Sequence, residues 1–170
     1  MKVKKTDLDG VLVITPPTVF RDFRGIYVET YNESLYKKHG IDMKFIQDDI
    51  SSSKKGVLRG IHGDDKTWKL VSCIHGEFFL VVVNNDPNSH QYKKSTSFTL
   101  NSEDPHQILI PPKFGNGHYV LSDCAIFHYK QTTLYNRSGQ FTIPWNSKEH
   151  KIYWPIEDPL TSVRDYKLEY

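Results

Sequence analysis

The stretch GVLRGIHGDDKTWKLVSCIHGEFFLVVVN, residues 56–84, decides the fold class. It contains three short runs rich in Val, Ile, Leu and aromatic residues, at 57–62, 68–74 and 77–84. These residue types favour strands, and the Gly63-Asp64-Asp65 cluster and Gly76 between the runs are typical of turns. The third run is almost entirely apolar, so both of its faces should be buried. The stretch therefore predicts three consecutive strands joined by short turns.

Similar runs continue on both sides of this stretch. Further strands are expected at 11–14, 25–31, 44–50, 97–100, 107–110, 118–121 and 125–134. One short helix is expected at 34–39, because Asn32 can cap its start and Gly40 can end it. The segment from about Trp145 onward is interpreted as irregular chain packed against the strands. Many strands at close spacing predict an all-β sandwich, jelly roll or barrel.

Length and charge restrict the class of protein. The 170 residues fit one domain, without repeats or linkers, so 1–170 is expected to form a single domain. The net charge is +2, with acidic and basic residues interspersed, which argues against a nucleic-acid-binding protein but allows a local basic pocket for a phosphate. The N-terminus MKVKKTDLDG lacks the apolar stretch of a secretory signal, and no run reaches the ~20 apolar residues of a membrane span. A soluble, cytoplasmic protein that does not bind membranes is expected.

The two cysteines, Cys73 and Cys124, lie in apolar runs without CxxC spacing. Free buried thiols in a reducing compartment are the favoured interpretation, with a disulfide between them as the alternative.

A small set of polar residues could carry chemistry. Arg59 and His62 lie in one expected strand, three positions apart, so a regular strand would direct them to opposite faces. Gly60 between them permits a bulge that could bring both to one side. Metal binding is disfavoured, because the chain has eight histidines but no HxH pair, and only His62, His118 and Glu77 could be combined into a site.

Seven motifs together resemble the dTDP-4-dehydrorhamnose 3,5-epimerase family. In chain order they are FRDFRGIYVE, IQDDISSS, GVLRGIH, WKLV, IPPKFGNGHYVLSD, YKQTTLY and TSVRD, and they run from about Val19 to Asp165. Each motif alone is weak, but seven in order are specific. The resemblance implies a cupin jelly-roll, no metal or other cofactor, and a homodimer that exchanges N-terminal strands. In such a dimer Arg24 would reach the neighbour's site.

The same resemblance implies a role for each motif residue. His62 would remove a proton from the carbon beside a C4 ketone, Tyr129 would return a proton to the opposite face, and Asp165 would orient His62. Lys69 would stabilise the enolate oxygen. The chemistry requires these types, because neutral imidazole is the available base near pH 7 and an enolate needs a cation in a poorly hydrated site.

Further residues are expected to bind the substrate. Arg24 and Arg59 resemble the family's diphosphate contacts, which suits the forked donors of guanidinium. The remaining expected contacts are Glu29, Gln47, Asp49, Asn116 and His118.

Three departures from the family pattern concern the substrate. Asn116 stands where the FxHGF motif has His, with His118 two positions later; the loop GDDKTW is short; and Asp49 replaces Asn. The sugar, the nucleotide or the number of inverted centres could therefore differ from the family type.

The expected function is inversion at C3 and/or C5 of a dTDP- or GDP-linked 4-keto-6-deoxyhexose, or of a related keto-heptose. The product would enter a surface polysaccharide such as capsule or lipopolysaccharide. Two alternatives remain open: a 3,4-ketoisomerase, whose RGxHAHK-like stretch GIHGDDK does not match, and a non-catalytic sugar-binding cupin.

Overall fold

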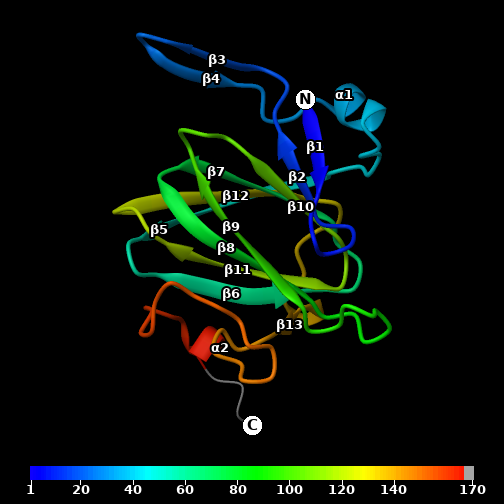
Figure 1. Cartoon of the computed structure of the whole chain (residues 1–170), viewed down its shortest axis with the longest axis vertical. Helices are drawn as coiled ribbons and strands as arrows, with labels where there is room; N and C mark the ends of the chain where they lie inside the picture. Colours follow the sequence, from blue (N-terminus) through cyan, green and yellow to red (C-terminus); the bar gives the residue numbers. More distant parts are fainter. Residues whose placement is uncertain (167–170) are drawn as a thin grey trace.

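Two antiparallel sheets packed face to face dominate the computed structural model, which describes residues 1–166 (Figure 1). One sheet has the strand order β1 (Lys2–Lys5), β2 (Leu12–Thr15), β10 (Gln107–Ile110), β7 (Lys69–His75), β12 (Cys124–Gln131), β5 (Gln47–Lys54). The other has the order β13 (Phe141–Thr142), β6 (Leu58–Gly63), β11 (Phe114–Val120), β8 (Glu77–Asn84), β9 (Ser95–Asn101). This arrangement confirms the predicted all-β, cupin jelly-roll class.

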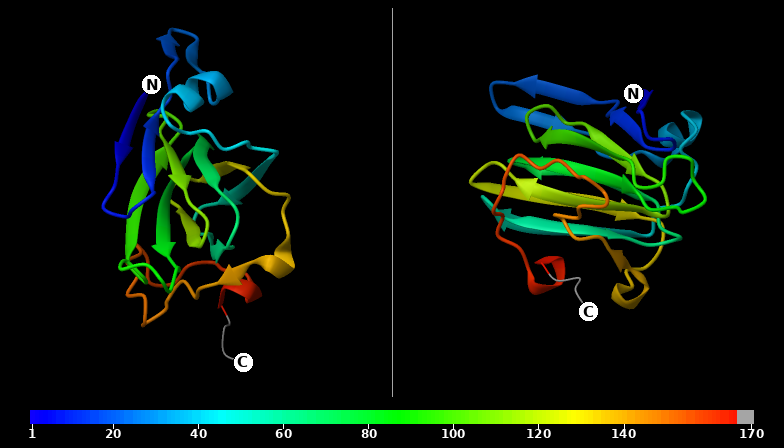
Figure 2. Two further views of the ribbon diagram at one scale, coloured as in Figure 1. Left: turned by 90° about the vertical axis from the view of Figure 1, so that its right-hand side faces the viewer. Right: turned by 60° about the horizontal axis from the view of Figure 1, so that its bottom comes forward.

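The alternation of side chains along β8 shows why an almost entirely apolar strand suits this position. Phe78, Leu80 and Val82 point into the main core between the sheets. Val81 and Val83 point the other way and pack with Ile143 and Trp154 of the C-terminal segment. Both faces of β8 are buried, as its composition predicts. The irregular C-terminal segment therefore covers the outer face of the second sheet (Figure 2).

The N-terminal part contains elements that lie outside the two sheets. Strands β3 (Val19–Asp22) and β4 (Gly25–Val28) form a separate hairpin that projects from one end of the molecule (Figures 1 and 2). Helix α1 (Glu33–Lys38) follows, and the Asn32 side chain accepts from the Leu35 N–H, as expected of its cap. The chain then leaves the helix through Gly40 at φ +82°.

Strand β6 departs from regular geometry where the sequence places Gly60. His62 pairs with Asn116 and Arg59 with His118, so three steps along β6 match two along β11. This is a bulge, and it brings Arg59 and His62 to the same face of the sheet. Gly60 has φ +104°, and a Cβ there would lie 2.6 Å from the Asn116 carbonyl oxygen. Only glycine fits this position.

Several element boundaries differ from the sequence predictions. The strand predicted at 118–121 begins at Phe114, because Gly115 and Gly117 leave room for Ile61 and the backbone of Arg59 on the neighbouring strand. The strand predicted at 44–50 is instead β5, which continues through three serines to Lys54 because its whole length pairs with β12. Strands β1 and β3, the 3-10 turn η1 (Arg137–Gly139) and the short helix α2 (Val163–Tyr166) carried too weak a local pattern to be predicted.

Two further predictions can be compared with the structure. Cys73 is buried, Cys124 is half-buried, and both are free thiols, so the alternative of a disulfide is wrong. Within residues 1–166 no helix combines the length and the apolar character needed to cross a bilayer.

Candidate active site

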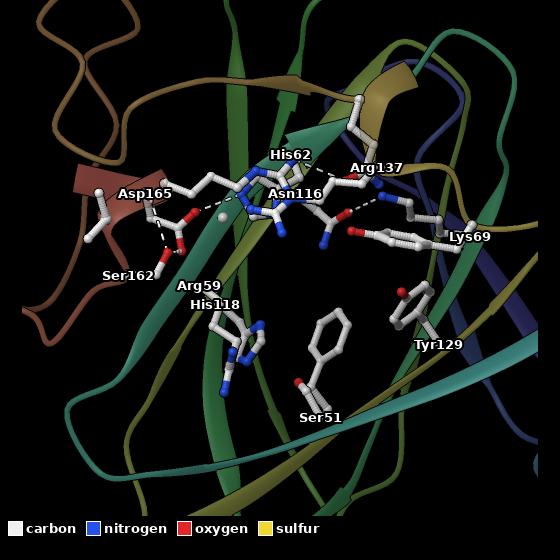
Figure 3. Close-up of a pocket in the computed structure, with 16 residues that line it drawn as sticks. Ser51, Arg59, His62, Lys69, Asn116, His118, Tyr129, Arg137, Ser162 and Asp165 are labelled. Carbon is white, nitrogen blue, oxygen red and sulfur yellow. Dashed lines mark hydrogen bonds and ion pairs between the residues drawn. The ribbon is translucent and has the colours of Figure 1, made fainter. Parts of the chain in front are cut away.

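A cavity of about 570 Å³ opens between the two sheets (Figure 3). Strands β6 and β11 of one sheet form one wall, and β5, β7 and β12 of the other sheet form the opposite wall. The turn η1 and the helix α2 close its sides. Its polar lining residues are Ser51, Arg59, His62, Lys69, Asn116, His118, Tyr129, Tyr135, Arg137, Gln140, Ser162, Arg164 and Asp165. Seven of the eleven site residues predicted from the sequence, Asp165 included, thus meet in one place.

His62 and Asp165 form a hydrogen-bonded pair, although they are 103 residues apart in the chain. The distance between His62 Nε2 and Asp165 Oδ1 is 2.7 Å. Asp165 is brought there because the C-terminal segment is fixed to β6 by backbone bonds between Leu58 and Leu160 and between Leu160 and Gly56. Helix α2, which carries Asp165, begins three residues after Leu160.

The state of Asp165 sets the tautomer of His62. Burial works to raise the pKa of Asp165, but the hydrogen bond and charge of His62 and the hydrogen bond from Ser162 outweigh it and lower the pKa below its usual range. Ser162 Oγ donates to Asp165 Oδ2 at 2.9 Å. An ionised carboxylate only accepts hydrogen bonds, so Nε2 of His62 must carry the proton. In the neutral imidazole Nδ1 is then the basic nitrogen, which is the arrangement a general base requires.

Lys69 is a buried cation on the facing sheet. It is 6% exposed, and burial lowers the pKa of its ammonium to about 8. Its Nζ donates to Asn116 Oδ1 at 3.2 Å across the cavity. At neutral pH most of these ammonium groups remain charged, so Lys69 can stabilise a negative oxygen in the cavity.

Tyr129 lies on the wall opposite His62. It belongs to β12 in the six-stranded sheet, whereas His62 belongs to β6 in the five-stranded sheet (Figure 3). Burial, reinforced by the charge of Asp49, raises the pKa of its phenol to about 12. The hydroxyl is therefore protonated at neutral pH and can donate a proton. A base and an acid thus face one cavity from opposite sides.

His118 forms part of the cavity wall as an uncharged aromatic ring. It stacks on Phe127 with ring centres 4.3 Å apart and planes inclined by 9°. Burial, followed by the nearby charge of Arg59, lowers its pKa to about 3. His118 therefore stays neutral across the physiological range and cannot supply a charge to the site.

The cavity has an excess of positive charge. Four cations line it, Arg59, Lys69, Arg137 and Arg164, and Asp165 is the one carboxylate among the described residues that line it. Since Asp165 is already engaged by His62, the lining can accommodate an anionic ligand. Arg59 is held by a 2.9 Å bond from Nε to Ser53 Oγ, which leaves the rest of its guanidinium for other partners.

Two of these arginines received no role from the sequence. Arg137 lies in η1, and Arg164 donates to Gln140 Oε1 at 3.2 Å. Arg164 lies directly before Asp165 in the TSVRD motif, and this position was a usable signal. Arg137 belongs to no motif, and only the position of η1 beside the cavity shows that it lines the site.

Four predicted substrate contacts do not line the cavity of their own chain. Arg24 belongs to the β3–β4 hairpin, pairs with Asp22 at 2.5 Å and is 76% exposed in its side chain. Glu29 follows the same hairpin. Gln47 and Asp49 are not among the residues that line the cavity, although the Asp49 carboxylate lies beside Tyr129 and accepts from the Gln47 amide at 2.9 Å. Their binding roles stay predictions. Within residues 1–166 no group of three His, Cys, Asp or Glu side chains is arranged to hold a metal ion.

Known proteins resemble this chain along nearly its whole length. A family model described as dTDP-4-dehydrorhamnose 3,5-epimerase matches residues 5–170. Enzymes of that description from Methanothermobacter thermautotrophicus and Escherichia coli are 40% and 39% identical, over 95% and 99% of this chain and 89% and 93% of theirs. The crystal structure of the Legionella pneumophila dTDP-6-deoxy-D-glucose-3,5-epimerase, in complex with dTDP-4-keto-L-rhamnose, aligns with a TM-score of 0.90 at 34% identity, covering 96% of this chain and 89% of that one. Every segment that lines the cavity lies within the matched region.

Proposed function

Since the chain belongs to the dTDP-4-dehydrorhamnose 3,5-epimerase family, a family of isomerases, we propose that it inverts C3 and C5 of a dTDP-linked 4-keto-6-deoxyhexose. The observation that carries this proposal is the placement of the His62–Asp165 pair and Tyr129 on opposite walls of one cation-lined cavity. The dTDP nucleotide is favoured over GDP because the relatives are named for dTDP sugars. The product would serve polysaccharide biosynthesis.

The reaction would begin with proton removal by His62. Nδ1 takes the proton from the carbon beside the C4 ketone, and the electron pair of the C–H bond moves to form an enolate. The imidazolium that results is stabilised by the Asp165 carboxylate at 2.7 Å. A positioned base of this kind typically contributes a factor of ~10²–10⁴ in rate.

The enolate would then be protonated from the other face. Lys69 holds the negative oxygen, and the Tyr129 hydroxyl gives its proton to the carbon, which inverts the centre. Tyr129 is afterwards reprotonated from solvent, and His62 returns its proton to solvent. Repeating the cycle at the second carbon beside the ketone gives the double inversion.

Substrate binding would use the positive lining and a neighbouring subunit. Arg59 is proposed to contact the diphosphate, and Asn116 and His118 to contact the sugar. We further propose that residues 1–170 act as one jelly-roll domain in a homodimer whose exchanged β3–β4 hairpin carries Arg24 and Glu29 to the partner's cavity. Phe20, Phe23 and Tyr27 on this hairpin are 67%, 99% and 65% exposed, which is unusual for large aromatic side chains and supports a covered position in an assembly.

Deuterium exchange tests the proposal directly. The protein is incubated in D₂O with dTDP-4-keto-6-deoxyglucose and, separately, with the GDP-linked sugar, and label at C3 and C5 is followed by NMR and mass spectrometry. Label at both carbons of the dTDP sugar is expected. Label at C3 alone would limit the activity to one centre, a moved carbonyl would indicate a ketoisomerase, and no label would disprove the proposal.

The control variant separates catalysis from binding. His62→Asn should lose at least ~10²-fold in exchange rate while still binding dTDP, because the positioned base is lost and the cationic lining is kept. Unchanged function in this variant, together with ligand binding, would favour the non-catalytic sugar-binding alternative.

A further inference from the structure

The side chain of Asn116 lies between the proposed base and the proposed cation. The backbone of Asn116 pairs with that of His62 where β11 lies beside β6. Its side-chain oxygen, Oδ1, accepts a hydrogen bond from Lys69 Nζ at 3.2 Å. Figure 3 shows this contact bridging the two walls of the cavity. Asn116 is 9% exposed, and no other described bond holds Lys69 by its ammonium.

The partner fixes which way the amide of Asn116 faces. A lysine ammonium has three donors and no acceptor, so the amide oxygen must point toward Lys69. The amide nitrogen, Nδ2, then points away from Lys69. No acceptor for Nδ2 exists within residues 1–166, and Nδ2 is not among the enclosed side-chain atoms that lack a partner. The nitrogen is thus open to the cavity that Asn116 lines.

We propose that Asn116 and Lys69 form a two-donor site for the substrate's C4 oxygen, in which the amide oxygen fixes the ammonium and the amide nitrogen donates to the same substrate oxygen. This inference rests on the proposed function and assigns its electrostatic step to a pair of residues. Two N–H donors set beforehand around a developing enolate are more effective than one mobile ammonium, because they need no reorganisation as the charge forms.

The residue type at this position explains a departure from the family motif. An imidazole here could become protonated and would then place a second positive charge beside Lys69. An amide keeps its N–H donors at every pH and adds no charge. Because the pKa of Lys69 is already lowered to about 8 by burial, an uncharged neighbour keeps more of the ammonium protonated at neutral pH.

Two substitutions separate the two roles of the amide. Asn116→Leu removes both the acceptor and the donor, so the exchange rate kcat should fall ~10²-fold, typical of losing one such donor, and the alkaline loss of kcat/KM should begin at lower pH. Asn116→Asp keeps an acceptor for Lys69 but has no N–H. Its alkaline limb should move to higher pH, while kcat stays low because a negative charge now lies beside the enolate.

The test uses the same deuterium exchange with dTDP-4-keto-6-deoxyglucose, measured from about pH 6 to 10, together with melting curves. A structural role alone would lower the melting temperature and leave the alkaline limb in place, which would overturn the inference. So would an Asn116→Leu variant that exchanges at the wild-type rate. If Asn116→Leu does not fold, Asn116→Asp still tests the inference, because it should lower kcat while moving the alkaline limb to higher pH. Absence of exchange in the wild-type protein would instead disprove the proposed function.

Discussion

At the scale of single residues, the site works by fixing protonation states. Asp165 is held ionised, Tyr129 is held neutral and Lys69 lies near the middle of its titration at slightly alkaline pH. His62 and Ser162 keep Asp165 ionised against the effect of burial, whereas burial itself keeps Tyr129 neutral and lowers the pKa of Lys69. Together these residues would give a base, an acid and a cation in one cavity.

The titration of Lys69 should be visible in the pH dependence of activity. Burial lowers its pKa to about 8, so the ammonium is present below that pH and is lost above it. We therefore expect kcat/KM, which reports groups of the free enzyme, to fall as the pH rises through about 8. Lys69→Arg should remove this alkaline limb, because guanidinium does not titrate there. A limb that persists in Lys69→Arg would assign it to another group.

Ser162 should act as a positioning residue for the His62–Asp165 pair. Its hydroxyl bonds Asp165 Oδ2 at 2.9 Å, and a hydrogen bond to a charged group is typically worth ~1.5–3 kcal/mol. Ser162→Ala should therefore lower kcat by about tenfold or more and leave KM nearly unchanged, as measured by steady-state kinetics.

Threonine at the same position provides the matched control, because Ser162→Thr restores the hydroxyl. The assignment would be wrong if Thr and Ala behaved alike, or if KM rose while kcat stayed constant.

At the scale of elements, the bulge in β6 is what makes the site. Three steps of β6 opposite two of β11 bring Arg59 and His62 to the same side, which a regular strand would prevent. The sequence allowed this outcome through Gly60, but the bulge itself depends on pairing with β11.

Gly60→Ala tests the bulge. The added Cβ would lie 2.6 Å from the Asn116 carbonyl oxygen and from Gly117 Cα, at a φ of +104°. We expect a loss of at least ~1–3 kcal/mol in the free energy of unfolding, measured by urea denaturation, and a loss of exchange activity because the backbone must shift.

Gly40→Ala is the matched control, since Gly40 also has a positive φ, +82°, but a Cβ there meets nothing within 4 Å. It should cost about 1 kcal/mol from backbone strain alone and leave activity intact. Equal destabilisation by the two variants would show that crowding at Gly60 is unimportant.

At the scale of the whole molecule, the hairpin and the cavity appear on one chain but do not meet there. The β3–β4 hairpin, which carries Arg24, projects from one end of the molecule (Figure 1). The cavity lies between the two large sheets. The proposed homodimer would place each hairpin at the partner's cavity, so each site would need residues from both chains.

Mixing two inactive variants tests this arrangement. Arg24→Ala and His62→Asn proteins are refolded together in equal amounts and assayed at low substrate concentration. If hairpins are exchanged, a hybrid dimer has one site with neither defect, and the mixture should regain about a quarter of the wild-type sites. Activity no higher than the mean of the two parents, or a monomer by light scattering, would contradict the exchange.

The sequence by itself determined the all-β class, the family and the list of candidate catalytic residues. Strand propensity, turn residues and the helix cap at Asn32 act over a few neighbouring positions, so they can be recognised in the linear chain. The seven ordered motifs indicated the family and the candidate residues, because each motif keeps its residues at short spacing.

Only the tertiary structure decided which of these residues act together. The His62–Asp165 bond spans 103 positions and the Lys69–Asn116 bond spans 47, and both depend on how strands from distant parts of the chain pair and pack. The cavity roles of Arg137 and Arg164, the glycine-containing start of β11 and the serine-rich half of β5 follow from the same long-range pairing. Local propensity says nothing about sheet register, and register decides which side chains face the cavity.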